Sequence, residues 1–152
     1  SKPIEKERLI SSIHTLIGKS ENLKICIIED DDNLRFTIKE ILEKQGNIII
    51  DASNGKDALS KLNKGNPLPD IILLDLMMPV MNGFEFLNQI KNTKIKSIPI
   101  LVLTGADLDD KDKLFLNNET EKVIQKTDET LLSITQEINN VMKRIGWNEK
   151  NR

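Results

Sequence analysis

The chain has 152 residues, of which 38% are hydrophobic and 30% charged, a composition typical of one globular domain. Its 22 basic and 24 acidic side chains give a net charge of −2, which argues against nucleic acid or an anionic membrane as the partner of the whole chain. No apolar stretch is long enough to span a membrane, the first residues are charged rather than apolar, and Cys26 is the single cysteine, so we expect a cytoplasmic protein without an internal disulfide.

Residues 1–22 come before the first apolar run and carry apolar side chains on one side of a predicted amphipathic helix. These side chains are Leu9, Ile10, Ile13, Leu16 and Ile17.

Short apolar runs predict strands at 23–28, 47–51, 70–74, 98–103 and 121–125. The first, third and fourth runs are apolar at consecutive positions, which is typical of parallel strands that are covered on both faces. A strand of this kind is buried, so these runs predict the centre of a sheet.

The segments between the runs have apolar residues at helical spacing. They are Leu34, Ile38, Ile41 and Leu42 before Gly46; Ala58, Leu59 and Leu62 before Gly65; Phe86, Leu87 and Ile90 after Gly83; and Leu131, Ile134, Ile138, Val141 and Ile145 near the end. The segment 107–118 is more polar and less regular. Alternating strands and helices from 23 to 146 predict an α/β, doubly wound parallel sheet, followed by a tail at 147–152.

Polar side chains follow four of the predicted strands. They are Glu29, Asp30, Asp31 and Asp32 after the first strand, Asp75 after the third, Thr104 after the fourth and Lys126 after the fifth. In folds of this class the functional crevice lies beyond the carboxyl ends of the strands. Asp31 or Asp32 also suits the N-cap of the first helix, and for Asp32 we prefer this capping role over a role in the site.

Carboxylates that converge repel one another, and this repulsion raises the pKa of at least one of them unless a cation neutralises the charge. Hard oxygen ligands suit Mg²⁺ or Mn²⁺, and a Mg²⁺ ion held by one or two carboxylates usually also binds phosphate oxygens. We therefore predict that Asp75 attacks phosphorus and forms an aspartyl phosphate, with Lys126 and Thr104 contacting the phosphoryl oxygens.

Four stretches together resemble the receiver domain of two-component response regulators: IIEDDDNLR at 27–35, PDIILLDLMMPVMNGFEFL at 69–87, IPILVLTG at 98–105 and VIQK at 123–126. The resemblance implies a flavodoxin-like fold with a five-stranded sheet of order 2-1-3-4-5. It also implies roles for Asp75 as phosphoacceptor, for Thr104 as the hydroxyl and for Lys126 as the phosphate-binding lysine.

The same resemblance implies a metal site. Asp30, Asp75 and the backbone carbonyl of Met77 would bind Mg²⁺ directly, and Glu29 would act largely through metal-bound water. Met77 and Ala106 stand where side chains could orient an attacking water, and neither can hydrogen-bond it, so we predict slow hydrolysis of the acyl phosphate.

Two positions depart from the family pattern. Val123 stands where most receivers have an aromatic residue that takes part in the switch, and Thr127 replaces a proline. The altered end resembles receivers at the C-terminus of hybrid histidine kinases, which favours a phosphorelay component.

At the other end, Lys2 and Pro3 resemble the last part of an upstream receiver, and the alternative is a linker or signalling helix that packs on this domain or forms a dimer. His14 is interpreted as an incidental helix residue.

We predict that the chain is a phosphoacceptor, which takes a phosphoryl group from a histidine kinase or a histidine phosphotransfer protein. We expect it to be a signalling domain and not an enzyme. One alternative is a pseudo-receiver that docks without being phosphorylated. Another is a phosphatase with an aspartate nucleophile, which the absence of a second aspartate at Met77 argues against.

Overall fold

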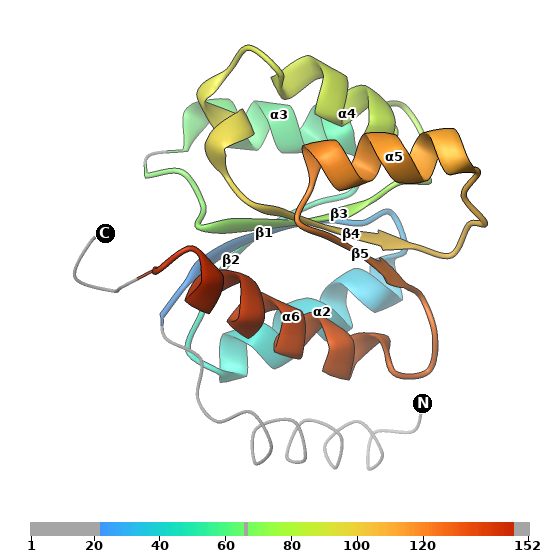
Figure 1. Ribbon diagram of the computed structural model, residues 1–152. Coiled ribbons are helices and arrows are strands. Elements are labelled where there is room, and N and C mark those ends of the chain that lie inside the picture. Colours follow the sequence, from blue (N-terminus) through green and yellow to red (C-terminus); the bar gives the residue numbers. More distant parts are fainter. Residues whose placement is uncertain (1–21, 66, 148–152) are drawn as a thin grey trace.

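The computed structural model describes residues 22–65 and 67–147 and arranges them in three layers (Figure 1). The middle layer is a parallel sheet in the order β2-β1-β3-β4-β5, which confirms the predicted order. Its strands are β1 (Lys24–Ile28), β2 (Ile48–Ala52), β3 (Ile71–Asp75), β4 (Ile100–Thr104) and β5 (Lys122–Gln125). All five lie within one or two residues of the predicted apolar runs.

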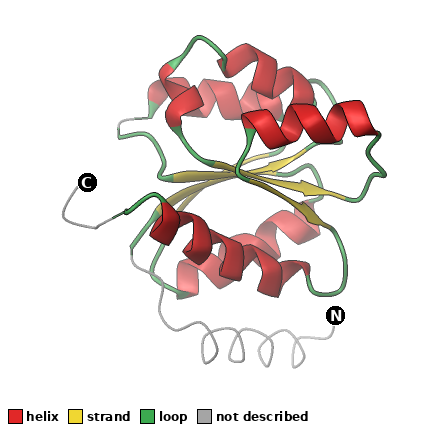
Figure 2. Ribbon diagram, viewed as in Figure 1, coloured by secondary structure: helices red, strands yellow, loops and turns green. Residues whose placement is uncertain are grey.

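Helices cover both faces of the sheet (Figure 2). One face carries α2 (Asp32–Lys44) and α6 (Thr130–Arg144), and the other carries α3 (Gly55–Lys64), α4 (Gly83–Ile90) and α5 (Asp110–Glu119). A short 3-10 helix, η1 (Lys94–Ser97), follows α4. The predicted helix at 1–22 lies outside the described residues except for Asn22. None of the described helices is both long and apolar enough for a membrane span.

The sheet separates two hydrophobic cores because successive side chains of a strand point to opposite faces. In β1, Ile25 and Ile27 pack toward α2 and α6, whereas Cys26 and Ile28 pack toward α3, α4 and α5. We name these the α2–α6 core and the α3–α5 core. Every residue of β3 and β4 is buried, as the continuous apolar runs predicted.

Two details of the helix predictions are wrong. The N-cap of α2 is Asp31, whose side chain accepts a hydrogen bond from Leu34 N at 3.1 Å, while Asp32 is the first helical residue and pairs with Arg35 instead. At the other end of the chain, Ile145 is 48% exposed because α6 ends at Arg144, and Met142 occupies the buried position.

Trp147 closes the described chain against the α2–α6 core. Its indole Nε1 donates to Asp70 Oδ1 at 3.2 Å, and Asp70 Oδ2 accepts from Lys24 N at 2.8 Å. Both contacts lie at the amino-terminal edge of the sheet, where β1 and β3 begin. The site described next is at the opposite edge.

Candidate functional site

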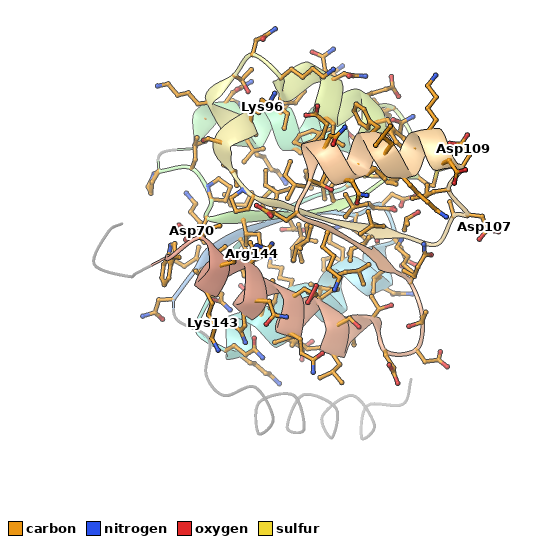
Figure 3. All side chains as sticks on the ribbon, in the orientation of Figure 1. Asp70, Lys96, Asp107, Asp109, Lys143 and Arg144 are labelled. Atoms are coloured by element: carbon orange, nitrogen blue, oxygen red, sulfur yellow. The ribbon has the colours of Figure 1, made fainter. Side chains whose placement is uncertain are left out.

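The predicted site residues meet at the carboxyl edge of the sheet. Lys126 Nζ lies 2.8 Å from Glu29 Oε1 and 3.4 Å from Asp75 Oδ1, so a lysine that follows β5 bridges acids that follow β1 and end β3. One carboxylate oxygen from each of Glu29, Asp30 and Asp75 lies within 4.8 Å of the others. Asp107 and Asp109 occupy the neighbouring loop between β4 and α5 (Figure 3).

Glu29 is fully buried because it extends β1 beyond its last apolar residue. Its N–H donates to Ala52 O at 3.0 Å, which continues the pairing with β2, and its Oε2 accepts from Asp31 N at 3.1 Å. Asp30, the next residue, is exposed. The β1–α2 turn thus holds one carboxylate in the interior and presents the other at the surface.

Asp75 is the last residue of β3 and is 1% exposed. Its Oδ1 accepts from Met77 N at 3.3 Å. Gly83, at the start of α4, lies directly beneath it: a Cβ at that position would come within 2.7 Å of Asp75 O. Glycine is therefore needed where the helix passes the strand end.

The loop from β3 to α4 contains a strained residue. Val80 has a φ of 66°, and Met81 N donates to Pro79 O at 2.7 Å, so a γ-turn is centred on Val80. Two backbone hydrogen bonds hold the ends of this loop, from Gly55 N to Met81 O and from Gly83 N to Leu76 O. No pattern in the sequence indicates a positive φ at this β-branched residue.

The acids of the site cannot all ionise at low cost. Burial, together with hydrogen bonding and charge repulsion from Glu29, raises the pKa of Asp75 to about 8, although Lys126 acts in the opposite direction. Asp30 is exposed, and the loss of part of its hydration disfavours its ionisation, but hydrogen bonds with Asp75 and Glu29 outweigh this loss and lower the pKa of Asp30. Burial similarly opposes the charge on Lys126, and Glu29 and Asp75 overcome it and raise its pKa.

A divalent cation fits this cluster. The donors are all carboxylate oxygens, which hard cations prefer, and a cation would favour the ionised form of Asp75 that burial now disfavours. Glu29, Asp30 and Asp75 could hold such an ion. The predicted contribution of the Met77 carbonyl stays a prediction.

Thr104 ends β4 one residue beyond Leu103, the register partner of Asp75, and is fully buried. Its Oγ1 accepts from Ala106 N at 3.0 Å. Val123 is half-buried against the α3–α5 core, in the place predicted for the missing aromatic residue. Thr127, which replaces the usual proline, donates its N–H to Thr130 Oγ1 at 2.7 Å at the start of α6.

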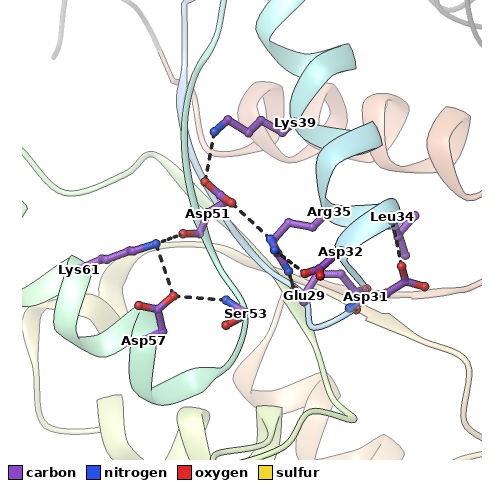
Figure 4. Close-up of polar contacts among 10 residues, drawn as sticks. All are labelled: Glu29, Asp31, Asp32, Leu34, Arg35, Lys39, Asp51, Ser53, Asp57 and Lys61. Atoms are coloured by element: carbon purple, nitrogen blue, oxygen red, sulfur yellow. Dashed lines mark hydrogen bonds and ion pairs between the residues drawn. The ribbon is translucent and has the colours of Figure 1, made fainter.

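Arg35, on α2 next to the acidic site, is a residue for which the sequence analysis predicted no role. It is 8% exposed, and its guanidinium donates to the backbone oxygen of Glu29 at 2.8 Å (Figure 4). The same group contacts Asp51 on β2 and Asp32 on α2. Arg35 lies close in sequence to the acidic run at 29–32, and this proximity could have indicated a role in the site. Its contact with Asp51 could not be predicted in this way, because that contact depends on the pairing of β1 with β2.

Comparison with known proteins identifies a family profile and relatives that match most of the described chain. Residues 25–136 match the family profile described as the response regulator receiver domain. The sensor histidine kinase CheAY of Helicobacter pylori is 33% identical over 62% of this chain and 13% of its own length. Protein PilG of Pseudomonas aeruginosa is 38% identical over 59% of this chain and 65% of its own length. The chain thus spans less than two thirds of either relative.

Solved structures extend the comparison. The receiver domain of the Francisella response regulator 1452 has a TM-score of 0.70 and 26% identity, over 82% of this chain and 99% of that one. The chemotaxis response regulator CheY4 of Vibrio cholerae has a TM-score of 0.66 and 29% identity, over 78% of this chain and 99% of that one.

Proposed function

Because the chain belongs to the response regulator receiver family of two-component signalling, we propose that it accepts a phosphoryl group from a phosphohistidine onto Asp75 and signals through the conformational change that follows. The observation that carries this proposal is the buried Asp75 carboxylate, 3.4 Å from the ammonium of Lys126 and grouped with Glu29 and Asp30. A carboxylate is a competent nucleophile toward phosphorus when it is ionised and the negative charge of the phosphoryl oxygens is neutralised.

In the proposed reaction an Asp75 carboxylate oxygen forms a bond to phosphorus. The bond from phosphorus to the histidine nitrogen breaks, and its electron pair stays on that nitrogen. Lys126 Nζ is close enough to Asp75 to neutralise one phosphoryl oxygen, and the Thr104 hydroxyl would donate a hydrogen bond to another. Asp30, Asp75 and the Met77 carbonyl would hold Mg²⁺ or Mn²⁺ directly and Glu29 would hold it largely through water, and the cation would neutralise charge on the phosphoryl group.

In this proposal the phosphodonor is the phosphohistidine of a histidine kinase or of a histidine phosphotransfer protein. We assign residues 23–146 to the receiver, with the segments 1–22 and 147–152 flanking it, and a cytoplasmic location. Phosphorylation would have to bias a surface with two conformations. Output then passes to a partner, another domain or a further relay step.

The alternative of a pseudo-receiver has one observation in its favour. Val123 is half-buried where a receiver with the usual switch has an aromatic residue, so the conventional coupling between Thr104 and that ring is absent at this position. The complete set of acids with Lys126 favours the phosphoacceptor instead.

Intact-mass spectrometry after incubation with Mg²⁺ and acetyl phosphate tests the proposal. We expect one phosphoryl adduct that requires Mg²⁺ and is absent from Asp75→Asn. A wild-type protein that stays unlabelled, under conditions that label an established receiver, would support the pseudo-receiver.

A further inference from the structure

The buried arginine of α2 contacts the backbone that carries two of the three acids. We infer that Arg35 is a positioning residue: its guanidinium holds the peptide between Glu29 and Asp30 in one orientation and thereby sets the affinity of the site for Mg²⁺. This inference rests on the proposed function, because it concerns the same cation site.

Three nitrogens of one planar group make three contacts from Arg35. Nη1 donates to Glu29 O at 2.8 Å, Nε donates to Asp51 Oδ2 at 3.2 Å, and Nη2 donates to Asp32 Oδ1 at 2.6 Å (Figure 4). A guanidinium presents its donors in a fixed fork, so fixing two of them fixes the third. Asp51 and Asp32 therefore aim Nη1 at the carbonyl of Glu29.

The carbonyl of Glu29 is the part of this turn that determines where Asp30 points. The peptide that joins Glu29 to Asp30 is planar, so a hydrogen bond to its oxygen restricts rotation of the whole plane. Pairing with Ala52 holds the N–H of Glu29, and Asp31 N holds its carboxylate. The Arg35 contact adds the restraint on the carbonyl side, immediately before the exposed Asp30.

Arg35 is itself anchored to the edge strand β2 through Asp51. The other carboxylate oxygen of Asp51 accepts from Lys39 Nζ at 3.3 Å, and its backbone oxygen accepts from Lys61 on α3. Asp57 on α3 pairs in turn with Lys61. This network runs from α2 around the edge of the sheet to α3 (Figure 4), so the orientation of the acids depends on β2, which contributes no ligand.

The first test is Arg35→Lys, which keeps the charge but cannot reproduce the fork. We expect the Mg²⁺ dissociation constant, measured by calorimetry without phosphodonor, to rise about tenfold, the lower end of the range for groups that orient metal ligands. At saturating Mg²⁺ the rate of labelling by acetyl phosphate should return close to the wild-type rate. The matched control is Lys39→Arg. Lys39 contacts Asp51 rather than Glu29, and the substitution conserves its charge. The Mg²⁺ affinity of this variant should equal that of wild type.

A second pair covers the case in which Arg35→Lys does not fold. Asp51→Asn removes the negative charge that anchors Arg35. Asp57→Asn also removes one negative charge, but Asp57 pairs with Lys61 rather than with Arg35. We expect the first to weaken Mg²⁺ binding more than the second.

Three results would overturn the inference. They are unchanged Mg²⁺ affinity in Arg35→Lys, equal Mg²⁺ affinity in Asp51→Asn and Asp57→Asn, and a labelling defect in Arg35→Lys that persists at saturating Mg²⁺. A wild-type protein that does not bind Mg²⁺ would instead remove the cation site itself, so failure of the proposed function is distinguishable from failure of this inference.

Discussion

Asp75 is buried and lies close to two other acids, and both effects raise its pKa to about 8 because they disfavour its ionised form. An aspartate in an unfolded chain has a pKa of about 4. Between these two values the folded protein binds a proton that the unfolded chain has lost, so the free energy of unfolding falls as the pH rises. Without a cation, the site therefore destabilises the fold at neutral pH.

Replacement of Asp75 by asparagine should remove this destabilisation. We expect wild type and Asp75→Asn to have similar free energies of unfolding near pH 4 in EDTA, and the variant to be more stable by about 1–3 kcal/mol at pH 8. Denaturant unfolding at several pH values measures the difference. A difference that does not change with pH would contradict the assigned protonation of Asp75.

In the proposed phosphorylated form, we expect the lifetime of the phosphoryl group to depend on two side chains beside the site. Met77 is 62% exposed and Ala106 is only partly exposed, and neither side chain can hydrogen-bond a water molecule. We expect phosphate to be retained far beyond seconds after removal of the phosphodonor, and Met77→Asn to shorten the lifetime by about tenfold or more, since a positioned hydrogen-bonding group can accelerate such a step. Intact-mass measurements over time decide; loss from wild type within seconds would refute the argument.

Helix α4 approaches the end of β3 closely because residue 83 has no side chain. In Gly83→Ala the new Cβ would lie within 3 Å of the backbone of Asp75 and Leu76, neither of which can move independently of the strand. We expect a loss of about 1–3 kcal/mol in the free energy of unfolding.

The control for this substitution is Gly105→Ala, in the loop that follows Thr104. There the nearest atom to a new Cβ is Lys126 Cδ at 3.9 Å, an ordinary contact. Thermal unfolding of the two variants should separate them clearly. Equal melting temperatures would show that α4 can move away from β3 without cost.

The sequence predicted best those elements whose pattern depends on burial alone. Apolar runs located every strand, and those of β1, β3 and β4 are continuous because a parallel strand covered on both faces has no polar side. The polar segment 107–118 gave only an approximate position for α5, which has Leu116 as its one buried residue and so leaves little periodic signal. The N-cap was left open between Asp31 and Asp32 because neighbouring aspartates suit the same role, and the structure has Asp31 in it.

Site features that depend on tertiary structure were not predictable in the same way. The acidic cluster could be predicted from strand ends, since parallel strands bring their carboxyl ends to one edge. The contact of Arg35 with Asp51 instead depends on two elements meeting at the edge of the sheet. No local pattern in the sequence encodes that distance.

The two cores share one sheet, so neither can unfold without exposing the strands that cover the other. Trp147 reports on the α2–α6 core, and far-ultraviolet circular dichroism reports on all helices and strands. We expect both probes to give the same midpoint in guanidinium chloride, as in two-state unfolding. A lower midpoint for fluorescence would show that α6 and Trp147 detach first.

The positive φ of Val80 also has a consequence for variation of the sequence. Its side chain is 73% exposed, so solvent rather than packing surrounds a residue whose backbone conformation favours glycine or asparagine. In a saturation library sorted only for resistance to proteolysis, codons for these two amino acids should therefore increase at position 80. Retention of valine in a library sorted for signalling would identify position 80 as one where activity, rather than folding, selects the residue.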